Sequence, residues 1–368
     1  MESRVRRAKA RSVAPTKASP FEAGRAHFAL PTLRPFYMNG IRYCEAIWRC
    51  TVVGICVPFL LAGDAQAYKA YVSNEKSNTI SIIDTAERKV VGTIKVGQRP
   101  RGIAITRDQK YVLVAVGDDD TIQMIDTATN KVVDTLPSGP DPELFTDDPS
   151  GRLLYVANEN DNTVTIIDIE RRTRLGDVEV GVEPEGMGLS PDGKILVNTS
   201  ETTNMAHFID TATRKIVANV LVDSRPRFAQ FKDDGSELWV SSEIGGTVSI
   251  IDPVKHAVKG KINFAIPGMR QEAIQPVGIA ITHDGKTGFV ALGPANRIAV
   301  IDGATHQVQK YLLVGQRVWH MAFTPDEKYL LTTNGVSNDV SVIDVAALKV
   351  IDTIQVGELP WGVAISQH

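Results

Sequence analysis

The chain has 368 residues, of which 43% are hydrophobic and 23% charged, and its formal net charge is −3. This is the composition of an ordinary globular protein with enough length for a large hydrophobic core. Ten of the 40 basic residues but only four of the 43 acidic residues lie in residues 1–67, so the remaining chain is clearly acidic. An acidic surface argues against nucleic acid and anionic membranes as partners.

The first 67 residues differ in kind from the rest. Residues 1–37 are rich in Arg, Ala and Pro and show no strand or helix pattern, so we interpret them as a disordered upstream extension. Residues 38–67 have the three parts of a secretory signal peptide, namely a basic segment, a short apolar run and a final Ala-Gln-Ala. The apolar run is too short for a membrane anchor. We therefore expect cleavage after Ala67 and a periplasmic protein without a membrane anchor.

From residue 68 onward the sequence repeats with a period of 42 residues. An apolar residue followed by Asp marks each of seven units: Asp84, Asp126, Asp168, Asp210, Asp252, Asp302 and Asp344. Their intervals are 42 residues, except for one of 50. A Pro lies 16 residues after most of these Asp residues, and an Asn, Asp or Gly lies six residues before each of them. Three positions that keep one period indicate a repeat architecture, so we interpret the repeated Asp as structural.

Each unit predicts four short strands. In the second unit these are residues 102–106, 111–116, 121–125 and 131–136. All are rich in β-branched residues and bounded by turn residues, as in propeller blades. The mature chain would begin with a second strand and end with a first strand at Trp361, so pairing of its ends would leave no open edge. We therefore predict an all-β, seven-bladed β-propeller with four-stranded blades over residues 68–368, closed by pairing of the C-terminal strand with the N-terminal strands.

Two segments resemble a known family of repeats. Residues 71–84 read Tyr-Val-Ser-Asn-Glu-Lys-Ser-Asn-Thr-Ile-Ser-Ile-Ile-Asp, and residues 155–168 read Tyr-Val-Ala-Asn-Glu-Asn-Asp-Asn-Thr-Val-Thr-Ile-Ile-Asp. They resemble the YVTN-type β-propeller repeat, and the mature chain is similar to the secreted propeller proteins associated with PQQ-dependent alcohol catabolism. This resemblance implies an accessory role beside a periplasmic quinoprotein dehydrogenase or its cytochrome, and it supplies no catalytic residues.

The residues on either side of the repeated Pro vary while the frame repeats. In a propeller the loop that ends at this Pro opens on the channel mouth, where an individual function is expected. We predict that ligand- or partner-binding side chains gather there: Arg99, Arg101, Asp141, Glu143, Glu183, Glu185, Arg225, Arg227, Arg317, Trp319 and Trp361. The alternative is that the charges only neutralise one another across a wet channel, and that the two Trp side chains fill the core between blades.

Two further features break the repeat. His320 falls on an expected innermost strand, where four other units have Gly, and it either faces the channel as a ligand or base or is a satisfied structural histidine. The interval of 50 residues adds eight residues to one loop on the mouth side of one blade. This loop is either a lid or partner contact, through Met269, Arg270 and Glu272, or a neutral insertion.

Several common chemistries lack their residues in the expected mature chain. All three cysteines, Cys44, Cys50 and Cys56, precede the predicted cleavage position, which excludes a disulfide or a thiolate metal site in the mature protein. The mature sequence also has no Gly-x-Ser-x-Gly segment, no covalent haem motif and no His pair with zinc-like spacing. These absences favour a protein that is not an enzyme, and we predict no cofactor.

Three functions stay open. The first is a non-catalytic binding or scaffold propeller for a periplasmic protein partner or a small ligand. The second is a metal-assisted lactonase-type hydrolase, in which a hard divalent cation would be held by Asp141, Glu143, Glu183 and Glu185. The third is a tetrapyrrole-binding propeller with His320 as the ligand.

Overall fold

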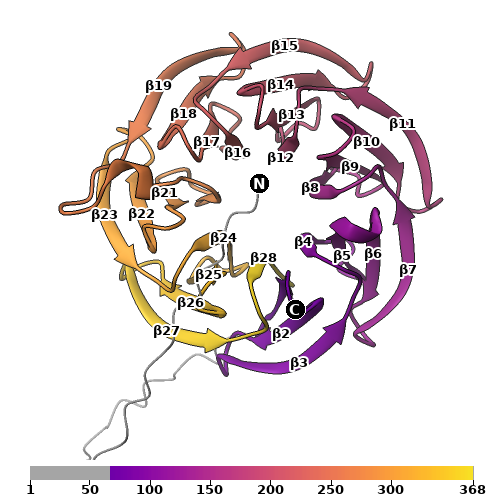
Figure 1. The fold of residues 1–368 in the computed structure, drawn as a ribbon, viewed down its shortest axis with the longest axis horizontal. Helices are drawn as coiled ribbons and strands as arrows, with labels where there is room; N and C mark the ends of the chain where they lie inside the picture. Colours follow the sequence, from indigo (N-terminus) through magenta and orange to yellow (C-terminus); the bar gives the residue numbers. More distant parts are fainter. Residues whose placement is uncertain (1–66, 368) are drawn as a thin grey trace, which may run out of the picture. The chain divides into compact units, whose positions relative to one another are not determined.

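The computed structural model describes residues 67–367, which form a ring of seven blades (Figure 1). Each blade is one four-stranded antiparallel sheet. The predicted all-β, seven-bladed fold is therefore confirmed. The predicted extension over 1–37 and residues 38–66 of the predicted signal peptide lie outside the described residues. Within the described range, no helix has the length and apolar character needed to cross a membrane.

The strands follow the chain from blade to blade. Blade A combines the last strand with the first three: β28 (Pro360–Ile365), β1 (Lys69–Asn74), β2 (Thr79–Asp84) and β3 (Lys89–Lys95). Blade B consists of β4 (Pro100–Ile105), β5 (Tyr111–Val116), β6 (Thr121–Asp126) and β7 (Lys131–Pro137). Blade C consists of β8 (Pro142–Asp147), β9 (Leu153–Asn158), β10 (Thr163–Asp168) and β11 (Thr173–Glu179). Blade D consists of β12 (Pro184–Leu189), β13 (Ile195–Ser200), β14 (Met205–Asp210) and β15 (Lys215–Leu221). Blade E consists of β16 (Pro226–Phe231), β17 (Leu238–Ser242), β18 (Thr247–Asp252) and β19 (Ala257–Asn263). Blade F consists of β20 (Ile279–Ile281), β21 (Thr287–Ala291), β22 (Arg297–Asp302) and β23 (Val308–Leu313). Blade G consists of β24 (Val318–Phe323), β25 (Tyr329–Asn334), β26 (Asp339–Asp344) and β27 (Lys349–Gln355).

The two ends of the described chain meet in blade A. β28 pairs antiparallel with β1, which places Val363 opposite Val72. At the start of β1, the backbone N–H of Lys69 donates to Ser366 Oγ at 3.0 Å. Pairing between the ends therefore closes the ring, as the sequence predicts.

The repeated polar residues hold the turns of each blade. The residue six positions before the repeated Asp has a positive φ in all seven blades, from 54° at Asp120 to 67° at Gly246, which suits the hairpin between the second and third strands. The repeated Asp binds the next turn, as where Asp84 Oδ1 accepts the N–H groups of Ala86 and Glu87 at 2.9 and 2.8 Å. The structural interpretation of these residues is confirmed.

The hydrophobic core lies between neighbouring blades rather than on the axis of the ring. Leu113 and Met124 of blade B pack in one cluster with Leu154 and Val156 of blade C, and all four are almost fully buried. Near the axis the inner strands crowd one another. A Cβ atom on Gly102 would lie 2.1 Å from the carbonyl oxygen of the next inner strand, so only Gly fits there.

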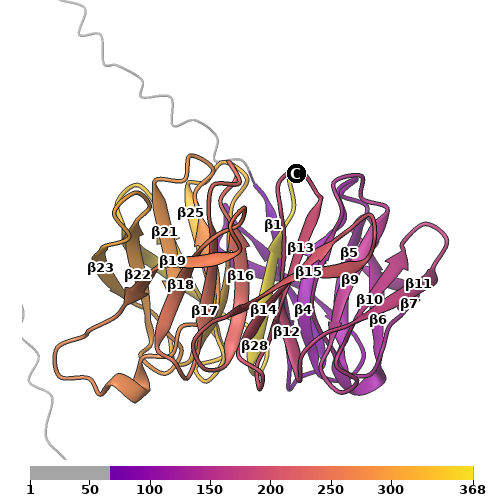
Figure 2. The same ribbon diagram turned by 90° about the horizontal axis from the view of Figure 1, so that it is seen from above.

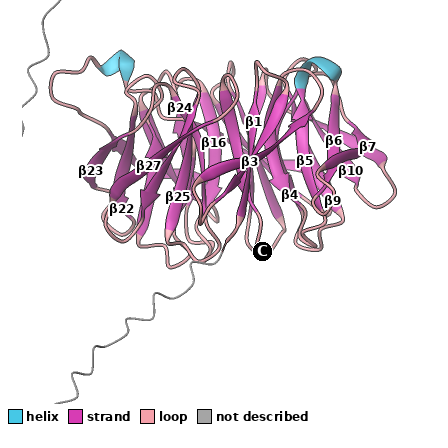
Figure 3. Ribbon diagram, turned by 90° about the horizontal axis from the view of Figure 1, so that it is seen from below, coloured by secondary structure: helices cyan, strands magenta, loops and turns pink. Residues whose placement is uncertain are grey.

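The two faces of the ring carry different loops (Figures 2 and 3). The loops that precede the inner strands and those that join second to third strands share one face, which also carries the short helices η1 (Gly117–Asp119) and η2 (Gln271–Ala273). The described chain ends at the opposite face. We call the first of these the mouth face, and the side chains that it gathers around the axis form the channel mouth.

Candidate binding site at the channel mouth

The start of each inner strand is fixed by the repeat. Except in blade F, the residue before this strand start has a positive φ, which is 56° at both Arg99 and Asp141. Its backbone N–H is bound by the hairpin of the preceding blade: Asn78 Oδ1 accepts from Arg99 at 3.0 Å, and Asp120 Oδ1 accepts from Asp141 at 2.9 Å. The repeated Asn or Asp therefore orders two loops at once and holds the variable residues in equivalent orientations.

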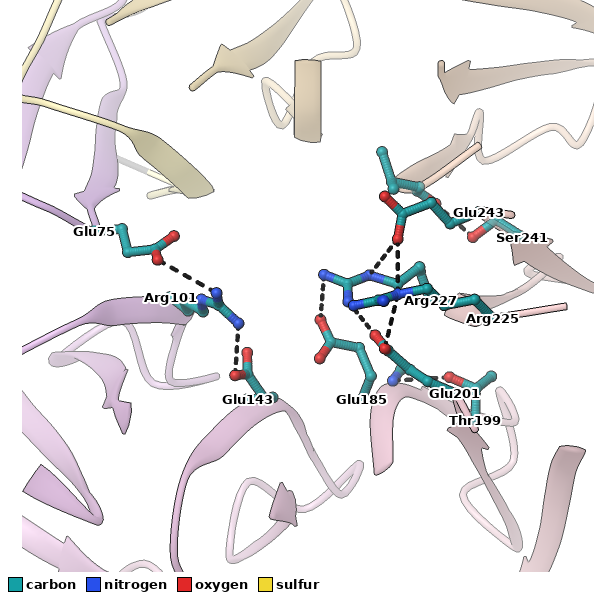
Figure 4. Close-up of polar contacts among 12 residues, drawn as sticks. Glu75, Arg101, Glu143, Glu185, Thr199, Glu201, Arg225, Arg227, Ser241 and Glu243 are labelled. Carbon is teal, nitrogen blue, oxygen red and sulfur yellow. Dashed lines mark hydrogen bonds and ion pairs between the residues drawn. The ribbon is translucent and has the colours of Figure 1, made fainter. Parts of the chain in front are cut away.

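A β-bulge follows the repeated Pro on most inner strands. In blade B, Pro100 pairs with Val116 but Ile103 pairs with Val114, so the inner strand has one extra residue between these pairs. The same irregularity occurs in blades A, C, D, E and G. A bulge redirects the side chain that it contains. In the structure the residues after Pro in blades B to E, namely Arg101, Glu143, Glu185 and Arg227, point toward the centre of the mouth (Figure 4).

The first ion-pair cluster surrounds Arg101. Its Nη1 donates to Glu143 Oε1 at 2.7 Å, and its Nη2 donates to Glu75 Oε1 at 3.3 Å (Figure 4). Arg99 Nη1 also donates to Glu143 Oε1, at 3.2 Å, and Arg99 forms further ion pairs with Asp118 and Asp141. Two guanidinium groups thus bind the same oxygen of Glu143.

The second cluster surrounds Arg227, which is only 6% exposed. Arg227 forms ion pairs with Glu185 at 3.2 Å, with Glu243 at 3.8 Å, and with Glu201 (Figure 4). Arg225 lies over the same carboxylates, with its Nε 2.9 Å from Glu201 and 3.1 Å from Glu243. Burial alone would lower the pKa of Arg227, but these carboxylates raise it, so its charge is permanent.

Several carboxylates of the mouth are buried without a full set of donors. Glu143 is fully buried, and its Oε2 accepts no hydrogen bond in the described part of the chain. Glu185 is 1% exposed, and neither of its oxygens accepts a hydrogen bond from residues 67–367. Burial raises the pKa of both groups, and burial raises the pKa of Glu201 to about 7. The mouth therefore holds carboxylates that the protein itself satisfies only in part.

The aromatic side chains lie on blades G and A. The ring centroids of Trp319 and Trp361 are 6.4 Å apart. Arg317 stacks over Trp319 at 4.1 Å, and its Nη2 donates to Glu243 at 2.6 Å. Trp361 is 1% exposed, with the Arg101 guanidinium 5.8 Å from its ring centroid, whereas Trp319 is half-buried at the mouth. Trp319 also packs against the hydrophobic cluster between blades F and G, and a role for either side chain in binding stays a prediction.

His320 is buried on β24, 7% exposed. Its ring centroid lies 4.2 Å from that of Trp361 and 5.4 Å from that of Phe228. Burial, followed by the charges of Arg227 and Arg101, lowers the pKa of His320 to about 3, so the imidazole is neutral at ordinary pH. Its ring has no hydrogen-bond partner among the described residues. A neutral imidazole can bind a metal through its ring nitrogen, but it cannot act as a general acid, which requires the protonated imidazolium form.

The long loop of blade F is anchored in the core. Phe264 and Ile274 are buried in the cluster between blades E and F, and Met269 packs partly against it. Of the predicted contact residues, Arg270 and Glu272 are exposed. The loop ends at Gln275, whose Oε1 accepts from Arg317 Nη1 at 2.7 Å. The insertion therefore connects to the mouth through Gln275, a residue outside the predicted set.

Four glutamates of the mouth escaped the sequence-based prediction. They directly follow the second strands of four blades: Glu75, Glu159, Glu201 and Glu243. Three of them form ion pairs with arginines, and Glu159 lies near Asp141 and Glu143 instead. They keep the period of the repeat, and Gly117, Gly293 and Gly335 occupy the same position in the other blades. The Gly residues make room, since a Cβ at Gly117 would lie 2.5 Å from Arg99 Nη2. The occurrence of either Glu or Gly at this one position of every repeat is a signal that the sequence contains.

The acidic group in the structure differs from the predicted set of cation ligands. Asp141, Glu143 and Glu159 each place one carboxylate oxygen within 4.8 Å of the other two, an arrangement that could hold a metal ion. Glu183 is not part of this group, and its carboxylate accepts from Thr202 Oγ1 at 2.5 Å. Glu185 is likewise outside it and faces Arg227.

Comparisons with known proteins agree on the fold. A family model described as "Choice-of-anchor I domain" matches residues 162–359. No curated protein matches the chain significantly. Among solved structures, the chain is similar to hydrazine synthase from Kuenenia stuttgartiensis, with a TM-score of 0.68 and 21% identity over 75% of this chain and 92% of that one. It is also similar to a periplasmic gluconolactonase from Pseudomonas aeruginosa, with a TM-score of 0.70 and 17% identity over 82% and 99%.

A third similar structure is that of a functionally unknown protein from Desulfotomaculum acetoxidans. Its TM-score is 0.69, with 17% identity over 81% of this chain and 98% of that one. The chain is thus a seven-bladed propeller that resembles YVTN- and lactonase-type propellers. At these identities the likeness shows the fold alone.

Proposed function

We propose that this chain, which belongs to the choice-of-anchor I domain family, is a non-catalytic binding propeller that holds a protein partner or a small charged ligand at its channel mouth. The observation that carries the proposal is the pair of buried, incompletely satisfied carboxylates, Glu143 and Glu185, beside Arg101 and Arg227. A buried polar group without a partner costs free energy, and a ligand that supplies the missing donors recovers it. The repeated frame leaves these positions free to vary, which is where a propeller can place a specific site.

The partner that we propose is a quinoprotein dehydrogenase of an alcohol oxidation system, or its cytochrome. The resemblance of the repeats to propeller proteins of PQQ-dependent catabolism supports this choice. The mouth also suits a basic partner, since its carboxylates outnumber its arginines and complementary charge accelerates and orients association.

The test is a binding measurement between the purified chain and a purified quinoprotein dehydrogenase or its cytochrome, at low and high salt. A double variant, Glu143→Gln with Glu185→Gln, should weaken association at least tenfold, on the order of 1.4 kcal/mol. The control variant, Asp233→Asn with Glu327→Gln, changes two acidic residues that line a cavity at the far end of the inner strands and should bind like wild type. Absence of association with either protein at low salt would overturn the partner assignment.

A periplasmic location is part of the same proposal. Cleavage after Ala67 would leave Tyr68 at the new N-terminus, and Tyr68 is 4% exposed with its N–H donating to Thr85 Oγ1 at 3.0 Å. The ordered ring would therefore start directly after the cleavage position. Sequencing the N-terminus of the exported protein tests this, and a start upstream of residue 62 would refute it.

A metal-assisted lactonase-type hydrolase is the second candidate function. The specific observation in its favour is the group of Asp141, Glu143 and Glu159, whose oxygens could hold a hard cation that polarises a carbonyl group. Hydrolysis of a lactone panel in the presence of added divalent cations tests it, and no turnover with any cation removes it. Tetrapyrrole binding through His320 stays a prediction, which the absorbance spectrum after addition of haem would test.

A further inference from the structure

We propose that Asp141, Glu143 and Glu159 bind one hard divalent cation, with Ca²⁺ the best match, at the mouth edge of blade C. One loop and one strand end bring the three together, because Asp141 and Glu143 flank the Pro that starts β8 and Glu159 directly follows β9. One oxygen from each lies within 4.8 Å of the others. Ligand oxygens at 2.3–2.6 Å from a Ca²⁺ ion can be up to about 5 Å apart, so the three fit around one ion.

A second observation also points to a ligand here. Glu143 is fully buried, its Oε1 is occupied by Arg99 and Arg101, and its Oε2 accepts no hydrogen bond from the described chain. The carboxylate of Glu159 has no hydrogen bond or ion pair in residues 67–367. A cation among the three residues would supply the partner that the buried Oε2 of Glu143 lacks and would balance the charge of the partly exposed Glu159.

Arg99 balances the charges of Asp141 and Glu143 in this structure, and Asp118 offers it an alternative partner. Arg99 contacts Asp141 and Glu143, and its Nε also lies 3.0 Å from Asp118, whose side chain is 56% exposed. A cation between Asp141, Glu143 and Glu159 would release Arg99 to Asp118, while Arg101 keeps Glu143 Oε1. The divalent ion and Arg101 together carry three positive charges against three carboxylates, so the exchange leaves the site neutral.

The ligand set selects the class of metal. All three residues offer carboxylate oxygens, which suit Ca²⁺, Mg²⁺ or Mn²⁺ rather than softer ions. Asn160 Nδ2 lies 3.3 Å from Asp141 Oδ2, and rotation of this exposed amide would present its carbonyl oxygen as a further neutral ligand. Loop ligands of mixed kind suit the flexible coordination of Ca²⁺ better than the strict octahedron of Mg²⁺.

This cation site does not rest on the partner proposed above, and the two can fail separately. If the chain captures a quinoprotein dehydrogenase or cytochrome in the presence of EDTA, the proposed function stands without the cation. If CaCl₂ binds and neither protein is captured, the cation site stands alone.

The test is titration of the full chain, previously treated with EDTA, with CaCl₂ and with MgCl₂ in a calorimeter. We expect one Ca²⁺ per chain with a dissociation constant on the order of 10⁻⁴–10⁻³ M, and weaker binding of Mg²⁺. Glu159→Gln should weaken Ca²⁺ binding at least tenfold, and Asp141→Asn should do the same. The matched control Glu183→Gln changes the equivalent of Asp141 in the next blade and should bind within twofold of wild type.

Arg99→Gln separates this proposal from a purely structural ion-pair cluster. If Arg99 competes with the cation, its removal should tighten Ca²⁺ binding about tenfold. Unfolding of each variant in denaturant establishes that it is folded. No binding of Ca²⁺ to either wild type or Arg99→Gln would overturn the proposal, as would equal weakening by Glu183→Gln and Glu159→Gln.

Discussion

Glu237 and Glu185 are both buried carboxylates, but they differ in the number of donors that the protein supplies to them. Glu237 precedes β17 and accepts from four donors, namely Lys232 Nζ, Lys259 Nζ, Trp239 Nε1 and His306 Nε2, at 2.8–3.0 Å. Glu185 has one ion pair, to Arg227 at 3.2 Å, and accepts no hydrogen bond in the described chain. The pKa of the two groups moves accordingly: burial raises that of Glu185, whereas at Glu237 the donors outweigh burial and lower it to about 2.

The contrast separates a structural charge from one that is available for binding. At Glu237 the protein supplies the solvation that burial removes, so the ionised form stabilises the fold. At Glu185 the protein leaves that solvation incomplete, which lowers stability and keeps oxygens free for a ligand. Natural proteins commonly accept such a loss of stability at functional sites.

Removing the charge at Glu237 should have the largest effect on stability. Glu237→Gln leaves Lys232 and Lys259 without their carboxylate, and Lys232 is 9% exposed. Breaking a buried ion pair in this way should lower the free energy of unfolding by about 3 kcal/mol. Urea denaturation measures it. Asp233→Asn, an exposed neighbour, is the control and should change stability by less than about 0.5 kcal/mol; equal losses from both variants would contradict the role given to Glu237.

The pKa of Glu201 at the mouth is raised and that of Glu237 is lowered, so the two groups should contribute to the pH dependence of stability with opposite signs. Glu201, in contact with Arg227, has a pKa raised by burial to about 7. A raised pKa in the folded state means that protonation favours folding, so this contribution is present at pH 4.5 and is lost as pH rises through 7. The free energy of unfolding should therefore fall between about pH 4.5 and 7, by at most about 1.4 kcal/mol per pH unit, and should level off above pH 7. Glu201→Gln should flatten this slope; an unchanged slope in the variant would assign the dependence to other groups.

The ring itself could be predicted from the sequence because its strand pairing is local and repeated. The spacing of Asp84 and Asn78 recurs in every unit, and each blade needs only neighbouring segments of the chain. The same repetition predicted that Arg101 and Glu143 lie on one face. Their contact could not be predicted, because it depends on a bulge that turns both side chains toward the axis.

The hydrogen bonds of Glu237 could not be predicted from the sequence either, for a different physical reason. Glu237 and His306 are 69 residues apart on different blades, and the positions equivalent to Glu237 in blades B, C and D hold Tyr111, Leu153 and Ile195 rather than an acidic residue. Glu159 and Glu201 did repeat, but recognising them required knowing that the loops after the second strands share a face with the starts of the inner strands. Sequence periodicity thus indicates equivalent positions, whereas the contacts between those positions follow from the three-dimensional arrangement of the loops.

The frame around the mouth should show a smaller, uniform effect. Asn162 has a positive φ of 60° and its Oδ1 accepts the N–H of Glu183 at 3.2 Å. Asn162→Gly keeps the backbone conformation and removes one hydrogen bond, so it should cost about 1 kcal/mol of stability. The equivalent change Asn204→Gly, which frees the N–H of Arg225, should cost about the same. Markedly unequal losses in denaturation experiments would mean that the two loops are held by blade-specific contacts.

Glu185→Gln should change stability least, and for that reason it sharpens the comparison most. Gln carries no charge to be buried, and Arg227 keeps its ion pairs with Glu201 and Glu243. Loss of the ion pair at 3.2 Å and relief of the unsatisfied charge oppose each other, so the free energy of unfolding at pH 7 should stay within about 1 kcal/mol of wild type. The same urea measurement as for Glu237→Gln applies. A loss near 3 kcal/mol would make Glu185 a structural charge like Glu237, and the mouth would then be a stabilising ion-pair network rather than a binding site.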